Sequence, residues 1–323
     1  MPKVSIIVPV YGVEKYIERC IRSLFNQTLD DIEYLFIDDC SPDRSIDILK
    51  QVLEEYPYRK QQVIIHRMDR NSGQAAVRKR GMLNATGEYI IHCDSDDWVD
   101  ISMYEDMYNL AKKDNADVAI CDFLRTDTKE FNKVEHGAHT TDKAGFLINC
   151  LFQRDHWSLC NKLFNRKVYY KEKVEYPAGA LGEDMALCIQ LLNACEKIAY
   201  IPKVYYFYYV NPMSITKKTT VSNCIKNYYT LKENTELVIN YINERLSINQ
   251  RTKAKAISYL KMVNLNTLLR VRHIPEYKII WDKEFRLMPP SFLLNPRISL
   301  YNKVIYILSL FPFYPTKDKR ITL

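Results

Sequence analysis

The first 123 residues alternate between short apolar runs and longer stretches with helical spacing, and this alternation limits the fold more than any other feature. The apolar runs are rich in β-branched and aromatic residues and predict strands at residues 4–11, 34–37, 63–65, 89–91 and 117–123. Between them, apolar residues recur every three or four positions, as on one side of an amphipathic helix. Strands that alternate with helices need crossover connections, so the sequence predicts an α/β fold with a mostly parallel central sheet.

Three of the predicted strands end in polar or strand-breaking residues. These ends are Pro9-Val10-Tyr11, Asp38-Asp39 and Asp94-Ser95-Asp96-Asp97. In parallel sheets, ligands bind beyond the carboxyl ends of the strands. We therefore expect the three ends to meet in one crevice that holds a ligand.

The last of these ends places three carboxylates, Asp94, Asp96 and Asp97, within four residues. Carboxylates this close disfavour one another's ionisation, and a hard divalent cation with oxygen ligands relieves the repulsion. A polar turn after a strand is the alternative. The four residues alone do not decide between a turn and a metal site.

The chain lacks the glycine-rich loops that hold phosphates in many nucleotide-binding folds. It has 8 glycines, with no G-x-G-x-x-G after the first predicted strand and no Gly-rich loop ending in Lys-Ser/Thr. This argues against a dinucleotide oxidoreductase or a P-loop nucleotidase. An acidic crevice then needs a metal ion or a basic side chain to hold phosphates. Arg78, Lys79 and Arg80 follow the turn at residues 71–73 and are candidates; a solvated helix face is the alternative.

A second group of acids, Glu183 and Asp184, begins an apolar helical run after Gly182. Acids in a first helical turn favour the helix dipole, which is one explanation for both. The other is a carboxylate that faces the crevice and acts as general base. Farther along, residues 199–210 are rich in tyrosine and predict a strand in which these rings pack in the core or at its rim.

Charge divides the chain into two parts. Residues 1–216 carry a net −5, whereas residues 217–323 hold 19 Lys and Arg against 7 Asp and Glu, a net +12. Long helices are predicted at residues 225–245 and 252–272, and the segment 292–314 is aromatic and apolar with basic residues within and behind it. This pattern predicts contact with an anionic membrane surface. A helical subdomain or an oligomer contact with a basic face is the alternative.

Cysteine usage and the lack of export signals predict a cytoplasmic protein. Nine cysteines are scattered without a C-x-x-C pair, which argues against a zinc site and favours reduced thiols. The sequence shows neither a signal-peptide pattern nor an apolar run of the ~18 residues needed to span a bilayer. No recognition motif or aromatic–basic platform for nucleic acid is visible.

Three stretches together resemble the family 2 inverting glycosyltransferases, which have the GT-A fold. They are VSIIVPVYGVEKYIERCIRSLFNQT, YLFIDDCSPD and NSGQAAVRKRGMLNATGEYIIHCDSDDW. The Gly-Glu-Asp run at 182–184 and the segment NPMSIT extend the likeness, which covers about residues 3–216. The resemblance implies a GT-A domain at residues 1–216, followed by a basic, mainly helical region at residues 217–323.

The resemblance also implies roles for residues of the donor site. The nucleotide sugar would contact Pro9, Val10, Tyr11, Asp38, Asp39, Asn71, Gly73, Arg78, Asp94, Ser95 and Asp96. Asp39 would read the uracil or other base edge, and Arg78 would approach the diphosphate. Asp94 and Asp96 match the D-x-D motif, and either Asp96 or Asp97 would contact Mn²⁺ or Mg²⁺ directly.

On the acceptor side, Asp184 matches the catalytic base of the family, with Glu183 as its neighbour. Trp157 and Lys162 fall in the segment that usually borders the acceptor.

Two positions depart from the family pattern. Relatives often have Asn where this chain has Lys79, and Arg where it has Tyr209. A phosphate contact from that Arg would be missing, or replaced by Lys217 or Lys218.

The implied reaction is the transfer of one sugar, a hexose or N-acetylhexosamine, from a nucleotide sugar to a hydroxyl of a glycan or lipid-linked acceptor in surface polysaccharide synthesis. UDP is the commonest nucleotide of the family. The processive Q-x-x-R-W motif is absent, which favours single-sugar transfer. The enzyme would lie peripherally on the inner face of the cell membrane, and an oligomer remains open. A sugar-phosphate nucleotidyltransferase and a non-catalytic sugar-nucleotide-binding module are the alternatives.

Overall fold

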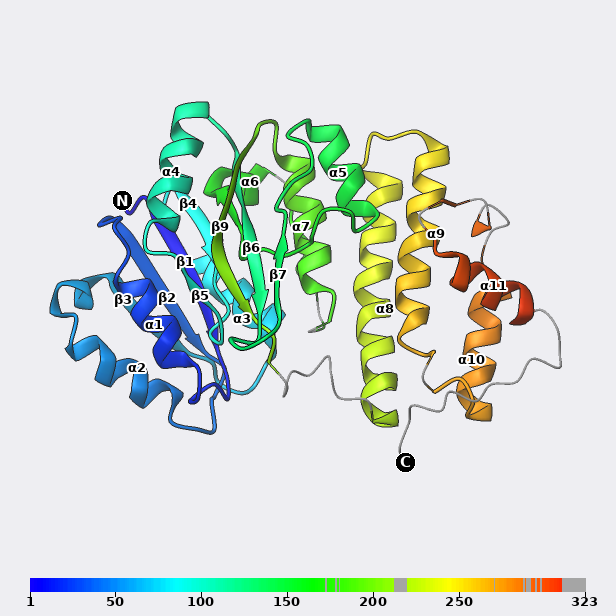
Figure 1. Ribbon diagram of the computed structural model, residues 1–323, viewed down its shortest axis with the longest axis horizontal. Coiled ribbons are helices and arrows are strands. Elements are labelled where there is room, and N and C mark those ends of the chain that lie inside the picture. The colour runs from blue at the N-terminus through cyan, green and yellow to red at the C-terminus, as the bar shows by residue number, and fades with distance from the viewer. Residues whose placement is uncertain are drawn as a thin grey trace. The chain divides into compact units, whose positions relative to one another are not determined.

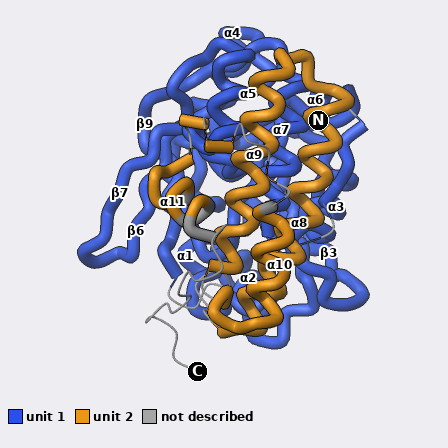
Figure 2. Tube along the Cα trace, turned by 90° about the vertical axis from the view of Figure 1, so that its right-hand side faces the viewer, with its two compact units in different colours: residues 1–211 blue, residues 212–323 orange. Residues whose placement is uncertain are grey.

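The chain divides into two compact units, Met1–Asn211 and Pro212–Leu323, which Figure 2 draws in different colours. The computed structural model describes residues 1–171, 173–177, 179, 181–211, 220–269, 271–286, 288, 292–293, 295–296 and 298–309. The boundary predicted between residues 216 and 217 lies outside the described residues, and so do Lys217 and Lys218.

A nine-stranded sheet runs through the first unit (Figure 1). Its strands are β1 (Val4–Val10), β2 (Ile32–Asp38), β3 (Val63–Arg67), β4 (Tyr89–His92), β5 (Trp98–Val99), β6 (Val118–Thr126), β7 (Asn132–Glu135), β8 (Lys162–Asn165) and β9 (Ile198–Tyr209). They lie in the order β3-β2-β1-β4-β8-β6-β9-β5, and β7 pairs with β6.

The half of the sheet formed by β3, β2, β1 and β4 is wholly parallel. Its crossover helices are α1 (Ile17–Phe25), α2 (Ser45–Glu54) and α3 (Gln74–Asn84), with a 3-10 turn, η1 (Pro57–Gln62), before β3. Strands β1, β2 and β4 are buried almost throughout, because helices and neighbouring strands surround them. This burial explains their continuous apolar sequence and confirms the predicted α/β fold with a mostly parallel sheet.

Gly81 brings α3 close to β1. A Cβ atom at Gly81 would lie 2.4 Å from Cγ2 of Ile7, so a larger residue would push the helix away from the sheet. The close approach also buries Arg78, which lies one turn earlier on α3 and is 1% exposed. A small residue in the helix thus places a guanidinium group in the interior.

The other half of the sheet mixes strand directions. β6 runs parallel to β9 and antiparallel to β7 and β8, and β8 joins this half to β4 by an antiparallel pairing. The helices of this half are α4 (Met103–Asp114), α5 (Lys143–Leu151), α6 (Arg166–Lys171) and α7 (Glu183–Ala194). The tyrosine-rich stretch predicted as a strand is β9.

The second unit is helical in its described part. Its helices are α8 (Val221–Glu244), α9 (Gln250–Asn266), α10 (Pro275–Arg286) and α11 (Leu300–Ser309). Helices α8, α9 and α10 share a core that includes the aromatic side chains of Tyr228, Trp281 and Phe285, and Phe292 packs in the same core. No helix in the described residues is both long enough and apolar enough to cross a bilayer.

Candidate active site

The carboxyl ends of β1, β2 and β4 lie side by side, because β1 pairs in parallel with both of the other strands. Tyr11, which follows β1, is exposed at this edge and Pro9 is half-buried. The Val10 side chain is buried, and its carbonyl accepts a hydrogen bond from the Asp39 N–H at 3.0 Å. Asp38 is buried beside Asp39. The residues predicted from the first two strand ends therefore lie together, with Tyr11 the most accessible.

Hydrogen bonds to Asp39 hold the loop that precedes α3 against the end of β2. Its two carboxylate oxygens accept hydrogen bonds from the N–H groups of Ser72 at 2.7 Å and Gly73 at 2.8 Å. Gly73 has a φ of +82°, a conformation that glycine adopts without strain. Asn71 is exposed in the same loop. A base contact from Asp39 would have to use the lone pairs that these two bonds leave.

Arg78 joins two acidic segments that are far apart in the sequence. Its buried guanidinium donates to Oδ1 of Asp94 at 3.0 Å and to Oδ1 of Asp184, and it lies 3.9 Å from Oε1 of Glu183. The Gln74 amide donates to the same Asp94 oxygen at 3.2 Å. The two basic residues that follow Arg78 on α3 are exposed, as expected for a solvated helix face. Arg78 thus holds the residues predicted for donor binding and for catalysis next to each other.

The two acids at the start of α7 differ in exposure. Gly182, with a φ of +83°, precedes the helix and turns the chain into it. Glu183 points inward, and burial raises its pKa to about 7, although the Arg78 charge acts in the opposite direction. The Asp184 side chain is 36% exposed. Asp184 is therefore the more accessible acid of this pair.

Asp97 is sealed inside the protein. The Tyr206 hydroxyl donates to its Oδ2 at 2.5 Å and the Tyr209 N–H donates to its Oδ1 at 2.7 Å. Tyr206 also accepts a hydrogen bond from the Asp94 N–H at 3.1 Å. Because both Asp97 oxygens are engaged and buried, Asp96 is the more accessible of the two carboxylates predicted as metal ligands.

Asp96 fits a divalent cation by its chemistry. Burial, followed by the charge of Asp94, raises its pKa to about 6, so a cation at this carboxylate would relieve an unfavourable charge. Its Oδ2 accepts a long hydrogen bond, 3.4 Å, from the Asn211 amide. In the described residues no three His, Cys, Asp or Glu side chains converge as a ready metal site. One carboxylate, with substrate phosphate oxygens as further ligands, is a usual arrangement for Mg²⁺.

Lys162 holds the loop at residues 156–161, which was predicted to border the acceptor, by hydrogen bonds from its buried ammonium. This lysine is fully buried, and its ammonium donates to the carbonyls of His156 and Ser158 and to Oδ1 of Asn161. Lys162 therefore shapes the loop at residues 156–161, and in this arrangement its ammonium does not reach solvent. Trp157 is half-buried and donates its indole N–H to the Cys150 carbonyl at 2.6 Å.

Arg19 carried no recognisable signal in the sequence, whereas Ser95 was predicted as a donor contact. Arg19 of α1 stacks on the Trp98 ring, 3.7 Å from its centroid, and donates to the Asp96 carbonyl at 2.9 Å. It also lies 5.0 Å from the centroid of the Tyr209 ring. Ser95, at the centre of the acidic run, is buried. A cation thus stands beside Tyr209, although it comes from a distant helix.

Comparison with known proteins identifies the family. Residues 5–187, more than half of the chain, match the family described as glycosyl transferase family 2. The chain belongs to glycosyl transferase family 2. It is 30% identical over 237 residues to the uncharacterized glycosyltransferase EpsJ of Bacillus subtilis, an alignment that covers 67% of this chain and 64% of EpsJ.

Two solved structures share the fold. The structure of Staphylococcus aureus TarS residues 1–349 in complex with UDP-GlcNAc matches with a TM-score of 0.71 and 17% identity, over 95% of this chain and 90% of that one. A Pyrobaculum calidifontis mannosyltransferase in complex with GDP-Man and Mn²⁺ matches with a TM-score of 0.55 and 13% identity, over 97% and 88%. The predicted GT-A fold is therefore confirmed.

Proposed function

We propose that this chain is an inverting, metal-dependent glycosyltransferase that moves one sugar from a nucleotide sugar to a hydroxyl of a glycan or lipid-linked acceptor in surface polysaccharide synthesis. One observation carries the proposal: a single buried guanidinium, that of Arg78, contacts both Asp94 of the D-x-D run and the accessible Asp184. A donor motif and a candidate base are thereby held within one side chain's reach. UDP is the expected nucleotide, and the UDP-GlcNAc complex of TarS supports this choice.

In this proposal the side chains divide the chemistry. Asp184 accepts the proton of the acceptor hydroxyl as that oxygen attacks the anomeric carbon, so the configuration inverts in one displacement. Arg78 orients the Asp184 carboxylate and compensates charge at Asp94. A divalent ion held by Asp96 would stabilise the negative charge of the leaving diphosphate. Asp97, with Tyr206 and Tyr209, holds the loop that presents Asp96.

Nucleotide release from a panel of sugar nucleotides tests the reaction class. Wild-type protein with Mn²⁺ should release UDP from one UDP-sugar when an acceptor extract is added, and EDTA should stop the release. A nucleotidyltransferase would instead consume a nucleoside triphosphate and a sugar phosphate and release pyrophosphate. A binding module would bind the donor without turnover. Release of pyrophosphate, or binding alone, would contradict the proposal.

The base is tested by Asp184→Asn. Transfer should fall about 10²–10⁴-fold, the usual contribution of a general base, while UDP affinity stays near that of the wild type. Asp47→Asn is the matched control, because Asp47 also lies in the first turn of a helix, α2, and is exposed. Near-normal turnover by Asp184→Asn would remove Asp184 from this role.

The metal role is tested by calorimetry. UDP should bind the wild-type protein more tightly with Mn²⁺ than without it, and Asp96→Ala should abolish this difference. Equal UDP affinity with and without metal in the wild type would contradict a metal at Asp96.

The proposal also places the protein on an anionic membrane surface. Support comes from the net +12 of residues 217–323 and from α11, where Leu300, Tyr301, Val304 and Ile307 are all exposed. Apolar side chains beside basic ones suit an interfacial helix. The double variant Val304→Asp/Ile307→Asp should sediment less with anionic vesicles than the wild type does. Leu83→Asp, at an exposed leucine of the first unit, is the control.

A further inference from the structure

Two rows of side chains cross strands β7, β6 and β9 on one face of the sheet. Phe123 of β6 pairs with Glu135 of β7 and with Tyr206 of β9. Two residues farther along β6, Arg125 pairs with Lys133 and with Tyr208. Directly paired residues point to the same face, and residues two apart on a strand do so as well. The cations Arg125 and Lys133 therefore lie in the row next to the one that ends in Tyr206.

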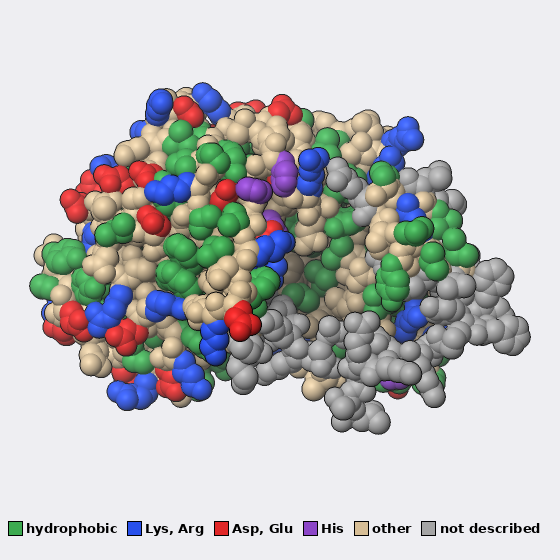
Figure 3. All heavy atoms as spheres, in the orientation of Figure 1, with side chains coloured by type: hydrophobic (Ala, Val, Ile, Leu, Met, Phe, Trp, Pro, Cys, Tyr) green, Lys and Arg blue, Asp and Glu red, His purple; other side chains and the backbone are tan. Residues whose placement is uncertain are grey.

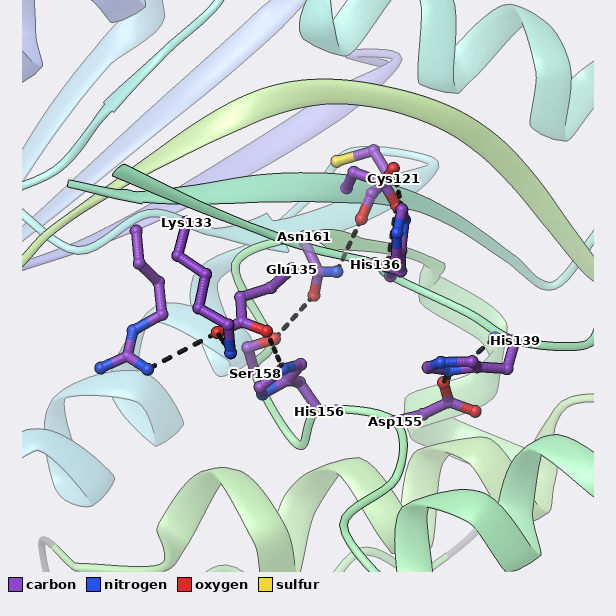
Figure 4. A network of polar contacts seen from close by, with 12 residues as sticks. Cys121, Lys133, Glu135, His136, His139, Asp155, His156, Ser158 and Asn161 are labelled. Atoms are coloured by element: carbon purple, nitrogen blue, oxygen red, sulfur yellow. Dashed lines mark hydrogen bonds and ion pairs between the residues drawn. The ribbon is translucent and has the colours of Figure 1, made fainter. Parts of the chain in front are cut away.

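Glu135 is the centre of a small cluster of basic groups (Figure 4). Lys133 lies 2.7 Å and Arg125 lies 3.6 Å from its Oε1, and Nε2 of His156 lies 3.3 Å from its Oε2. Burial alone would raise the pKa of Glu135, but the contacts with Lys133 and His156 lower it overall. One ionised carboxylate thus balances two permanent cations and an imidazole, which leaves positive charge in excess at this point.

The basic partners of Glu135 remain open to solvent. The side chains of Lys133, Arg125 and His156 are 59%, 40% and 35% exposed, whereas that of Glu135 is 10% exposed. Figure 3 shows histidine and basic side chains close together on this face of the molecule. The buried ammonium of Lys162 lies under the same loop, where its hydrogen bonds go to uncharged oxygens. A ligand approaching this cluster meets the cations first.

The cluster is connected to the acidic run after β4 through the paired strands β7, β6 and β9. Tyr206, in the row of Glu135, donates to Asp97 at 2.5 Å. The Arg125 guanidinium lies 5.9 Å from the centroid of the Tyr208 ring, and the Phe123 and His156 rings are in edge contact at 5.0 Å. In the sheet, β8 separates this group of strands from β4, β1 and β2, whose ends carry the donor-site acids. The cluster therefore borders the site on the side away from Asp39.

Two further histidine–aspartate pairs hold the segment that follows β7 (Figure 4). His136 contacts Asp122 at 3.2 Å and His139 contacts Asp155 at 2.5 Å. Both carboxylates are buried, and Asp122 also accepts bonds from the Gly137 N–H at 2.8 Å and the Tyr200 hydroxyl at 2.6 Å. These contacts hold the chain that leaves β7.

We propose that Arg125, Lys133 and His156 form a subsite for a phosphate group carried by the acceptor. Arginine offers a planar pair of donors that suits phosphate oxygens, and lysine adds a mobile point charge. The inference rests on the proposed function, in which the donor occupies the acidic strand ends and this side is left to the acceptor. It narrows the acceptor to one in which a phosphate lies near the hydroxyl that receives the sugar.

Binding of a small phosphate ester tests the subsite without any turnover. The probe is glycerol 1-phosphate, with glycerol as its neutral counterpart, titrated while the ring signals of the six histidines are followed by NMR. The His156 signal, assigned with His156→Asn, should shift with glycerol 1-phosphate and not with glycerol. The shift should persist with saturating UDP and Mn²⁺. A His156 signal that does not respond, or one that UDP suppresses, would overturn the subsite.

Variants identify the groups that bind. Arg125→Gln should lower the affinity for glycerol 1-phosphate at least ten-fold, and Lys133→Gln should lower it several-fold. The affinity of Arg125→Lys should lie between those of the wild type and Arg125→Gln, because lysine keeps the charge but lacks the paired donors. Lys129→Gln is the matched control, since Lys129 is an exposed lysine of the same hairpin outside the cluster. Circular dichroism would verify that each variant is folded. Equal affinities for all four variants would overturn the assignment.

The source of the phosphate is read from two further probes. Glycerophosphoglycerol represents a phosphodiester of a polyol-phosphate chain, and geranyl diphosphate represents a lipid-linked acceptor. Arg125-dependent binding of either one supports the subsite and names the source, whereas binding of neither overturns it. If the sugar-nucleotide panel fails while the phosphate probes bind, the reaction is wrong and the subsite stands. The reverse result removes the subsite alone.

Discussion

The two halves of the sheet differ in the charged groups that they carry. On the side of β2, β1 and β4, the strand ends present Asp38, Asp39 and the Asp94–Asp97 run, and Arg78 is the buried cation among them. On the side of β7, β6 and β9, two exposed cations surround Glu135. The acidic half suits a metal ion that brings a diphosphate, and the basic half suits a phosphate directly. One fold thus offers two different means of holding an anion.

The two halves also differ in how their charges are compensated. Arg78 is buried, and so is Glu183, one of the carboxylates beside it, so water cannot replace the guanidinium there. Arg125 is 40% exposed, so water screens its interaction with Glu135. The same residue type should therefore have very different importance for stability in the two places.

The largest effect is expected from removing these two arginines in turn. Arg78→Gln leaves the carboxylates of Asp94, Glu183 and Asp184 without their shared cation, which should lower the free energy of unfolding by about 3–5 kcal/mol. Arg125→Gln is the matched variant and should cost less than about 1 kcal/mol, as is usual for exposed ion pairs. Urea unfolding followed by circular dichroism measures both. Similar losses for the two variants would contradict the contrast between the halves.

A second test concerns Glu183, the buried acid beside Arg78. Its pKa is about 7 in the folded protein, above the ordinary value of 4.5. As pH rises from 4.5 toward 7, the unfolded chain releases this proton first, so the folded state loses stability, up to about 3 kcal/mol in all. Glu183→Gln carries no such proton. The free energy of unfolding of Glu183→Gln should therefore rise relative to that of the wild type between pH 4.5 and 7. Below pH 4.5 the two should be equal.

Urea unfolding between pH 4 and pH 8 measures the Glu183 effect. The informative quantity is the difference in unfolding free energy between Glu183→Gln and the wild type at each pH. A difference that stays flat across the whole range would show that Arg78 keeps Glu183 ionised, and the acidic half would then be better compensated than its burial suggests.

The acidic half was predictable from the sequence because its motifs are contiguous. An apolar run followed by acids marks a strand and its end, and the parallel alternation places such ends at one edge. Thus the sequence alone was enough to place Asp39, Asp94 and Asp96 at the same edge of the sheet, beyond the ends of β2 and β4. The direction of each side chain could not be predicted in the same way, since Asp96 and Asp97 are adjacent and only packing decides which one is buried.

The basic half was not predictable, because its residues meet through strand register. Arg125, Lys133 and His156 are separated by a hairpin and a helix, and no local pattern connects them. The sequence indicated a strand rich in tyrosine, yet periodicity cannot tell that the Tyr206 hydroxyl reaches a carboxylate on another strand end. The same limit applies to Lys162, which was placed near the acceptor by position and proves to be buried under the loop.

Tyr206 of β9 contacts Asp97 and so connects the two halves. Removing its hydroxyl should lower stability only modestly, but the result tests the connection directly. Tyr206→Phe leaves Oδ2 of the buried Asp97 without its donor, at a cost of about 1–3 kcal/mol. Tyr205→Phe is a close control, because the Tyr205 hydroxyl makes the same kind of bond, at 2.5 Å, to Asp106, whose side chain is 41% exposed. Water can replace that bond, so Tyr205→Phe should cost clearly less.

The two tyrosine variants separate a structural from a functional role for the junction. If Asp97 holds the loop that presents Asp96, Tyr206→Phe should also weaken the Mn²⁺-dependent part of UDP binding, whereas Tyr205→Phe should leave it unchanged. Calorimetry with and without Mn²⁺ measures this directly. A loss of stability with unchanged metal dependence would mean that Tyr206 only fills the core. The basic half would then contribute nothing to the position of the acidic one.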